Sequence, residues 1–367
     1  MKKIAFVTYD RTPYRILQLN EYTKSFEITA YYNAVSLKNR DWNLPNSKFT
    51  EKKINGIIKF RNRYLINFGI KELVESNDII MVGGYDSPSS LYICLMCKLM
   101  KKDYCITMDG ISPSKIENKN TLKYLLKKLI IKNAKTFFAN GLSAKEYLIN
   151  EFNVDKSRIY NQYLAVDNDG VQEAKRLKLS EPLYRVFKES NKYKLIYSGR
   201  LLEGKNVPII LDAINKIENK NEYTLIILGD GPEKEKILKK SKLYEIDTKI
   251  TGFIEEQSQL FSAYYKGDIL ILPSKDDSWG LVVNEAMAAG LPIIASKSTG
   301  SAKDLILDGI NGYTFNADEA DELAKAIEKV YKVGERKMGK ESGKIINNWN
   351  FSNSLKSLSN MINVWYK

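Results

Sequence analysis

The stretch from residue 270 to residue 296 constrains the fold of this chain more than any other. It opens with an apolar run that ends at Pro273, continues through a polar turn, and then shows helical spacing of apolar residues over 279–289. A glycine and a proline end that helix before a second apolar run, 293–295. The pattern predicts a strand, a helix and a parallel strand, with the turn and the helix start at the carboxyl edge of the sheet.

A helix that starts at this edge favours an anionic ligand, because its first amide groups have no acceptor within the helix. Two carboxylates frame the helix start: Asp277 lies just before it and Glu285 lies in its second turn, with seven residues between them. At that separation the two groups cannot contact one ligand atom, but they can hold two hydroxyl-bearing parts of one elongated ligand. The sequence therefore predicts a site for an anion that also carries hydroxyl groups.

This stretch resembles the signature of retaining glycosyltransferase family 4. The family has two acidic residues separated by seven positions around a Phe-Gly-Leu-like helix start, followed by Glu-Ala-Met-Ala-x-Gly-x-Pro. The match is close at 279–281 (Trp-Gly-Leu) and at 285–292, and the departure is Asp277, where the family usually has Glu. The resemblance implies an α/β chain of the GT-B type, with two Rossmann-like domains that face each other across a cleft.

A second motif of the same half lies between residues 198 and 206. It carries Arg200 and Lys205 in a loop that Gly199 and Gly204 make flexible, so the two cations can reach one diphosphate. It resembles the Gly-Arg-Leu…Lys-Gly/Asn motif of the same family.

The resemblance implies a role for each matching residue. Glu285 would bind ribose hydroxyls, Arg200 and Lys205 would hold the diphosphate, and Asp277 would hold the donor sugar. The predicted catalytic residues are Asp109, Asp277, Arg200 and Lys205, and the predicted donor-binding residues are Glu285, Ser278, Trp279, Gly280, Leu281 and Gly199.

Asp109 is the candidate from the first half of the chain. It follows the apolar run 104–108, which is a predicted strand, and Gly110 comes next. A polar side chain at a strand's carboxyl end points toward the ligand edge, and family 4 proteins often have a His or an acidic residue here. The alternative is that Asp109 and Gly110 only make a turn. The family's Gly-rich loop after the first strand is absent, and Arg11 or Arg15 could replace it by charge.

Regular alternation of strand and helix patterns predicts parallel sheets in both halves. The predicted organisation is a first, acceptor-binding domain at 1–167, a linker at 168–192, a nucleotide-sugar-binding domain at 193–351, and a last helix at about 352–367 that packs back on the first domain. The strands predicted for the first half are 4–8, 26–31, 57–60, 78–82, 104–108, 136–139 and 158–160. Those predicted for the second half begin at 194, 224, 249, 269 and 292.

The charge of the chain is concentrated in its first half. The formal net charge is +13, and residues 1–150 hold 25 basic against 13 acidic residues. Within them, 119–133 has helical spacing, with Leu122, Leu125, Leu126, Leu129 and Ile130 on one face and Lys123, Lys127 and Lys128 elsewhere. Such a helix can lie on an anionic membrane surface. The alternative is a helix whose leucines face the core and whose lysines face solvent.

Several classes of function are excluded or disfavoured. The chain has no histidine, so a Ser-His-Asp triad, a His-ligated zinc and a histidine base are impossible. Cys94 and Cys97 lie in an apolar run, which favours a buried helix over a metal or redox site. No apolar run of 18 residues is present, and no motif of stacking aromatics suggests a nucleic-acid partner. We expect no metal and no cofactor.

The sequence thus predicts a metal-independent, retaining glycosyltransferase that uses a nucleotide-diphosphate sugar and a glycan or lipid-linked acceptor. The uneven charge and the basic helix favour a cytoplasmic protein that is peripheral at the inner face of the cell membrane. The resemblance implies a role in the synthesis of envelope polysaccharide or glycolipid. Two alternatives stay open: another enzyme of the same fold, such as a sugar-nucleotide epimerase or a phosphorylase, and a non-catalytic partner of another transferase.

Overall fold

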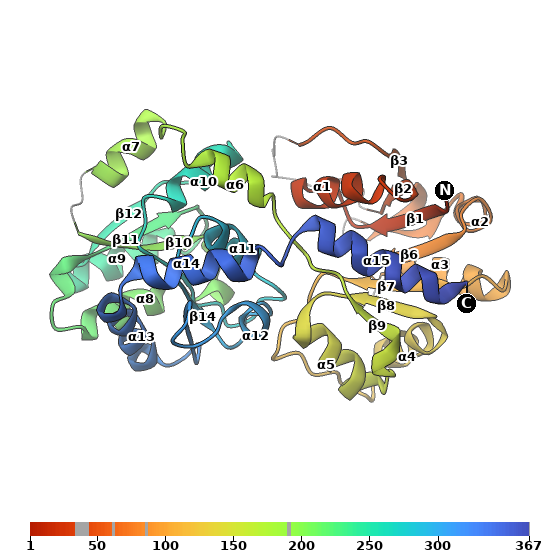
Figure 1. The fold of residues 1–367 in the computed structure, drawn as a ribbon. Helices are drawn as coiled ribbons and strands as arrows, with labels where there is room; N and C mark the ends of the chain where they lie inside the picture. The colour runs from red at the N-terminus through yellow and green to blue at the C-terminus, as the bar shows by residue number, and fades with distance from the viewer. Residues whose placement is uncertain (34–43, 61–62, 85–86, 189–191, 367) are drawn as a thin grey trace. The chain divides into compact units, whose positions relative to one another are not determined.

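A computed structural model of the chain describes residues 1–33, 44–60, 63–84, 87–188 and 192–366 and divides it into two compact units (Figure 1). The first unit comprises Met1–Gly110, Lys115–Leu164 and Phe351–Lys367. The second comprises Ile111–Ser114 and Ala165–Asn350. Each unit is built on its own parallel sheet.

The sheet of the first unit has seven strands in the order β3-β2-β1-β6-β7-β8-β9, and all neighbours pair in parallel. Its strands are β1 (Lys3–Thr8), β2 (Glu27–Tyr32), β3 (Thr50–Lys53), β6 (Ile79–Gly83), β7 (Tyr104–Met108), β8 (Thr136–Ala139) and β9 (Ile159–Asn161). The chain moves from β1 outward to β3 and then returns to the other side of β1. This reversal between β1 and β6 is the switch point of a doubly wound sheet.

Helices cover both faces of this sheet, and the connections decide which helix lies where. The helices are α1 (Pro13–Tyr22), α2 (Ile70–Glu75), α3 (Pro88–Leu99), α4 (Leu122–Asn133), α5 (Gly141–Phe152) and α15 (Phe351–Trp365). From β6 to β9 the chain always steps in one direction, so right-handed crossovers put α3, α4 and α5 on one face and α1 on the other. The last helix, α15, packs on α1 and β9, and its Leu358 and Met361 enter the core beside Phe6 and Tyr22.

Two features of the first half differ from the sequence prediction. The predicted strand 57–60 is β4 (Gly56–Phe60), which forms an antiparallel hairpin with β5 (Arg63–Asn67) outside the main sheet. The edge strand β3 was not predicted, because its residues Thr-Glu-Lys-Lys are all exposed and carry no apolar pattern. Lysines on an edge strand hinder pairing with another chain, so this composition suits its position.

The sheet of the second unit has six parallel strands in the order β12-β11-β10-β13-β14-β15. They are β10 (Tyr193–Ser198), β11 (Tyr223–Leu228), β12 (Asp247–Ile250), β13 (Ile269–Leu272), β14 (Ile293–Ser296) and β15 (Gly312–Phe315). Numbered along the chain, this is the order 3-2-1-4-5-6 of the dinucleotide-binding sheet, with its switch point between β10 and β13. The short strand β15 was not predicted, since its residues Gly-Tyr-Thr-Phe form no continuous apolar run.

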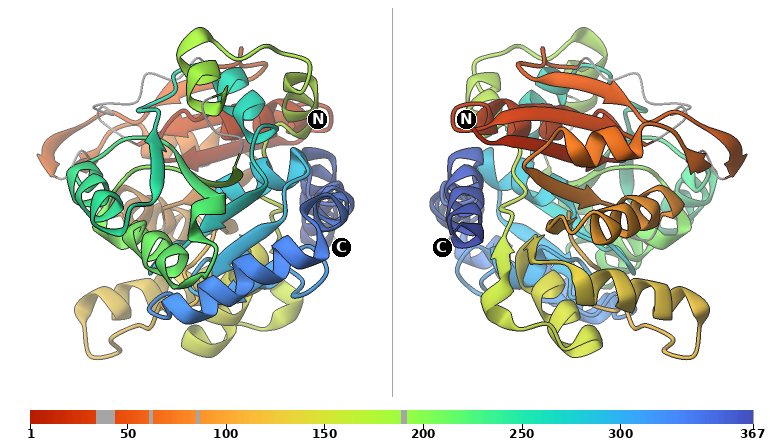
Figure 2. Two further views of the ribbon diagram at one scale, coloured as in Figure 1. Left: turned by 90° about the vertical axis from the view of Figure 1, so that its left-hand side faces the viewer. Right: turned by 90° about the vertical axis from the view of Figure 1, so that its right-hand side faces the viewer.

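The helices of the second unit connect and flank these strands (Figure 2, left). They are α6 (Asn168–Ala174), α7 (Glu181–Lys188), α8 (Pro208–Lys216), α9 (Lys234–Tyr244), α10 (Gln257–Tyr264), α11 (Leu281–Ala288), α12 (Ala302–Leu305), α13 (Ala320–Val333) and α14 (Glu335–Ile346). The predicted linker 168–192 contains α6 and α7 and is part of the second unit, while 189–191 lies outside the described residues. Among the described residues, no helix is long and apolar enough to cross a membrane.

The loops after β10 and β11 are held together through their backbones. Gly199 N donates to Leu228 O at 3.0 Å, and Leu201 N donates to Asp230 O at 2.9 Å. A Cβ atom added at Gly229 would lie 2.0 Å from the carbonyl oxygen of Gly199, and Gly229 has a φ of +153°. Only glycine therefore allows the two loops to approach this closely.

We predict that Gly229→Ala lowers the free energy of unfolding of the second unit by about 2 kcal/mol or more, because the backbone must shift to admit the methyl group. Gly204→Ala is the matched control, since no atom lies within 4 Å of its added Cβ. Calorimetric unfolding of both variants tests this. Equal thermal midpoints for Gly229→Ala and Gly204→Ala would contradict it.

Candidate functional site

The switch point of the second sheet brings the two sequence motifs together. The loop after β10 contains η2 (Glu203–Lys205), and the loop after β13 leads into α11. The two loops are joined by a backbone hydrogen bond, in which Lys275 N donates to Gly204 O at 2.9 Å. Loops that leave neighbouring strands on either side of a switch point form the usual ligand site of such sheets.

An ion pair between Lys205 and Asp277 lies at the start of α11. The Nζ atom of Lys205 is 2.5 Å from Oδ2 of Asp277, and the hydroxyl of Ser274 donates to the same oxygen at 3.4 Å. The Asp277 backbone is fixed as well, because Gly300 N donates to its carbonyl oxygen at 2.9 Å. The predicted cation from the β10 loop therefore does reach the helix start, 72 residues further along the chain.

Gly280 is the residue that lets the chain turn from this loop into the helix. It caps α11 with a φ of +85°, a left-handed conformation that glycine adopts without strain. An added Cβ would lie 2.7 Å from Cδ2 of Leu272 and 3.1 Å from Cγ2 of Thr299. The first amides of α11 consequently open directly beside Asp277, where the helix dipole favours negative charge.

Arg200 is placed differently from Lys205. Its side chain is exposed, and among the described residues its guanidinium makes no ion pair. Its carbonyl oxygen accepts a hydrogen bond from the Tyr197 hydroxyl at 2.9 Å. Burial raises the pKa of Tyr197, Asp277 raises it further and Arg200 lowers it, so both charged groups act on that hydroxyl. Arg200 is thus close to the site, with its cation available to a ligand.

Glu285 lies deeper and is held by Tyr264 of α10. The Tyr264 hydroxyl donates to Oε2 of Glu285 at 2.7 Å and lies 2.9 Å from Oγ of Ser198 at the end of β10. Only 9% of Glu285 is exposed, and this burial raises the pKa of its carboxyl group to about 7, although the hydrogen bond from Tyr264 lowers it. The carboxyl group is therefore positioned against the same strand end as the Arg200 loop.

The other predicted donor-binding residues differ in how accessible they are to a ligand. The side chain of Trp279 is buried: its Nε1 donates to Asn284 Oδ1 at 2.9 Å, and its ring stacks on Trp349 at 5.3 Å. Trp279 can therefore offer a ligand only its backbone. Ser278 is exposed, whereas Gly280 and Leu281 are partly buried at the helix start.

In the first unit, Asp109 follows β7 and is held by three side chains. Arg15 forms an ion pair with it, Gln162 Nε2 donates to it at 3.0 Å, and the Tyr14 hydroxyl donates at 3.4 Å. Burial alone would raise the pKa of Asp109, but Arg15 and then these hydrogen bonds outweigh it and lower the pKa. Asp109 is 43% exposed and ionised, so its carboxylate is accessible to a ligand.

The arginines proposed to replace a Gly-rich loop have other partners. Arg15 is almost fully buried against Asp109 and also donates to Gln18, while Arg11 pairs with Glu51 at 3.0 Å. Gln18 in turn donates to the Ser354 hydroxyl at 3.0 Å, and Ser354 donates to the Gln162 carbonyl oxygen at 2.5 Å. Arg15 therefore positions Asp109 within a buried network that includes α15.

The residues of these two clusters that sequence reasoning missed include Ser198, Tyr264, Gln162 and Ser354. Ser198 could have been found, because it is the last residue of a predicted strand at the ligand edge. The other three come from helices or strand ends distant in sequence, and nothing in their local patterns distinguishes them. The three cysteines are buried and free, and burial raises the pKa of Cys97 and Cys105 to about 12, which makes both poor nucleophiles.

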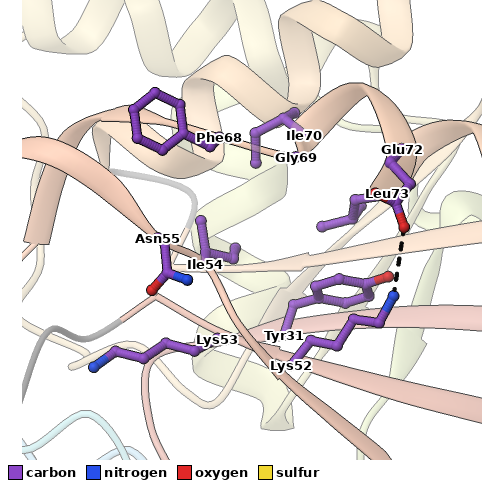
Figure 3. Close-up of a pocket in the computed structure, with 10 residues that line it drawn as sticks. All are labelled: Tyr31, Lys52, Lys53, Ile54, Asn55, Phe68, Gly69, Ile70, Glu72 and Leu73. Carbon is purple, nitrogen blue, oxygen red and sulfur yellow. Dashed lines mark ion pairs between the residues drawn. The ribbon is translucent and has the colours of Figure 1, made fainter.

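A separate hollow of about 240 Å³ lies on the first unit (Figure 3). It is lined by residues of β2, β3 and α2, and its rim includes Lys52, which forms an ion pair with Glu72 at 3.6 Å. None of the predicted site residues lines it. Within the described part of the chain, no group of three or more Cys, Asp or Glu side chains could hold a metal ion.

Comparison with known proteins assigns this site to a family. Residues 184–345 match the family described as Glycosyl transferases group 1. This segment forms most of the second unit and contains Arg200, Lys205, Asp277 and Glu285. The matched segment is less than half of the chain, and it confirms the predicted resemblance to glycosyltransferases for the second unit.

Individual relatives show the same extent of similarity. The chain is 33% identical over 149 residues to N-acetyl-alpha-D-glucosaminyl L-malate synthase of Bacillus anthracis, which covers 39% of each protein. It is 31% identical over 130 residues to lipopolysaccharide 1,2-N-acetylglucosaminetransferase of Salmonella typhimurium, which covers 32% of this chain and 34% of that protein. The matches span less than half the length of these curated relatives.

Solved structures extend the similarity to the whole chain. The crystal structure of Anabaena HepE in complex with UDP has a TM-score of 0.75 at 15% identity and covers 99% of this chain and 100% of that one. At this identity the similarity establishes the fold. The predicted fold class, two Rossmann-like domains of the GT-B type, is confirmed.

The raised pKa of Glu285 predicts a pH-dependent contribution to stability. In the unfolded chain Glu285 ionises near its ordinary pKa of 4.5, and in the folded unit near 7, so the folded state binds more protons between these values. The folded unit therefore loses up to about 3 kcal/mol of stability from this group as pH rises from below 4.5 to above 7. The free energy of unfolding of Glu285→Gln, measured relative to the wild type, should therefore be higher at pH 8 than at pH 5.

Calorimetric unfolding of the wild type and Glu285→Gln at both pH values measures this difference. Glu235→Gln on α9, an exposed position, is the matched control and should show no such change. If the effect of Glu285→Gln is the same at pH 5 and pH 8, the carboxyl group titrates in its ordinary range.

Proposed function

We propose that the protein is a retaining glycosyltransferase that moves a sugar from a nucleotide-diphosphate sugar to a hydroxyl group of a glycan or lipid-linked acceptor. The observation that carries the proposal is the contact between Lys205 and Asp277 at the start of α11, inside a group 1 glycosyltransferase domain. A cation, a helix N-terminus and two carboxylates within one switch point match the parts of such a donor: a diphosphate and hydroxyl-bearing rings.

Each group has a proposed role. Arg200, Lys205 and the amides at 279–281 bind the diphosphate, and Glu285 accepts hydrogen bonds from the ribose hydroxyls. Asp277 binds the transferred sugar, and its ion pair with Lys205 positions the carboxylate. The shorter Asp side chain, in place of the usual Glu, remains hydrogen-bonded to Ser274 and Lys205. Asp109 is the candidate catalytic residue of the first unit.

The proposed chemistry needs no metal, because two side chains and a helix end neutralise the departing diphosphate. The bond between the anomeric carbon and the phosphate oxygen breaks while the acceptor oxygen bonds to the same face of that carbon. The acceptor's proton passes to the departing phosphate oxygen. Retention of anomeric configuration follows, since bond making and bond breaking share one face.

The names of the relatives support the acceptor class and the donor class. One is named for transfer to lipopolysaccharide, and HepE was crystallised with UDP. We therefore propose a cytoplasmic enzyme, peripheral at the inner face of the membrane, that acts in envelope polysaccharide or glycolipid synthesis.

Alanine substitutions test the diphosphate clamp. Arg200→Ala and Lys205→Ala should each lower kcat/KM roughly ten- to a hundredfold, because a charge-assisted phosphate bond contributes about 1.5–3 kcal/mol. Lys216→Ala, which removes an exposed pair with Asp321, is the control and should keep wild-type kinetics.

The Lys205→Ala result needs one further variant, because it leaves Asp277 without its cation. Lys205→Ala/Asp277→Asn removes both charges. Compared with Asp277→Asn alone, no further loss in the double variant means that Lys205 only neutralises Asp277; a further loss supports phosphate binding. Wild-type kinetics in both single variants would remove these cations from the clamp.

The stereochemistry of the product tests the reaction class. A panel of nucleotide sugars, with UDP-sugars included, is first screened for thermal stabilisation of the protein. The product made from the best donor should keep the donor's anomeric configuration in its NMR spectrum. Inversion would refute the proposed mechanism, and consumption of donor without any acceptor would favour the epimerase alternative.

A further inference from the structure

Helix α4 presents leucines to solvent. Leu122, Leu125, Leu126 and Leu129, here called the leucine row, are 72, 57, 36 and 39% exposed. The residues that face the core are instead Tyr124, Ile130 and Ile131. The alternative in which the leucines pack inward and only lysines face solvent is therefore wrong.

The lysines of α4 do not all belong to this surface. Lys127 is buried: its Nζ is 2.8 Å from Oε1 of Glu117, to which the Tyr147 hydroxyl also donates at 2.6 Å. This internal ion pair anchors α4 to the preceding loop and to α5. Lys123, Lys128 and Lys132 are exposed beside the leucine row. The sequence-based assignment of Lys127 to a membrane contact is corrected accordingly.

The elements next to α4 also expose apolar side chains, and α3 exposes a lysine as well. Ile116, in the loop before α4, is 79% exposed. Helix α3 lies beside α4 on the same face of the sheet (Figure 2, right) and exposes Leu95 and Leu99 together with Lys98. Neither α3 nor α4 contains an acidic residue. The exposed sides of these two helices thus combine apolar side chains with basic ones.

We propose that the leucine row inserts into the interfacial region of an anionic lipid bilayer, with Lys123, Lys128 and Lys132 near the headgroup phosphates. This inference rests on the proposed function, because it supplies the surface on which a lipid-linked acceptor resides. An amphipathic helix with leucines on one side and lysines flanking them matches such a surface in both polarity and charge. A second copy of the chain fits less well, because a symmetric contact would bring the same lysines together.

Vesicle co-sedimentation tests the proposal. The wild type should bind phosphatidylcholine vesicles that contain phosphatidylglycerol and bind pure phosphatidylcholine more weakly. Leu125→Gln/Leu129→Gln should lower binding at least about tenfold, because two inserted leucines are lost. Lys128→Gln/Lys132→Gln should lower it by about fivefold for each lysine, and only on anionic vesicles.

The matched control is Leu238→Gln/Leu243→Gln on α9, a lysine-rich helix of the second unit whose two leucines are also exposed, at 42 and 76%. It should bind vesicles as the wild type does. Absent vesicle binding by the wild type would overturn the proposal, as would unchanged binding by Leu125→Gln/Leu129→Gln. A wild-type dimer in light scattering that this variant converts to monomer, with no vesicle binding, would assign the row to self-association instead.

A donor assay separates this inference from the proposed function. Thermal stabilisation of Leu125→Gln/Leu129→Gln by nucleotide sugars should equal that of the wild type, since the row is remote from the donor site in sequence and lies on the other unit. Vesicle binding without any nucleotide-sugar binding would refute the transferase proposal and leave the membrane surface standing.

Discussion

The ion pair between Lys205 and Asp277 joins the two loops on which the candidate donor site depends. Each loop leaves a buried parallel strand, and the order of the six strands places β10 and β13 side by side at the switch point. The same arrangement brings Tyr264 between Ser198 and Glu285, so a second contact joins the two motifs deeper in the unit. The sheet topology therefore brings together the charged side chains, the start of α11 and the carboxylates that can accept hydrogen bonds from hydroxyl groups.

The first unit repeats this sheet order but has a different site. The candidate catalytic residue of this unit, Asp109, is kept ionised by Arg15, whose own position depends on Gln18 and through it on Ser354 of α15. A buried cation of this kind is costly unless it is paired, and removal of either partner would leave an uncompensated charge. The last helix of the chain is thus part of the support for a residue that lies far earlier in the sequence.

Helix α4 shows how an apolar stripe can mislead. Periodicity identifies which residues share a face, but the leucine row is exposed while Tyr124, Ile130, Ile131 and the paired Lys127 are buried. The face of α4 that packs against the sheet is decided by contacts with α3, α5 and Glu117, and these contacts do not involve the apolar stripe. A lysine can be buried where a carboxylate and a tyrosine hydroxyl are positioned to bind its ammonium group.

The sequence by itself determined the α/β class and most strands of both sheets, because periodicity is a local property. Its motifs also predicted Arg200, Lys205, Asp277 and Glu285 as candidate site residues, because motif spacing is local as well. It did not determine the hairpin β4–β5, the edge strands β3 and β15, or the partners of Asp109 and Glu285. Those depend on which strand lies beside which, and on side chains that meet across long stretches of chain. Only the tertiary structure could decide them. Burial and ion pairing arise between segments that are far apart in the sequence, and the local pattern of one segment does not show which other segment it contacts.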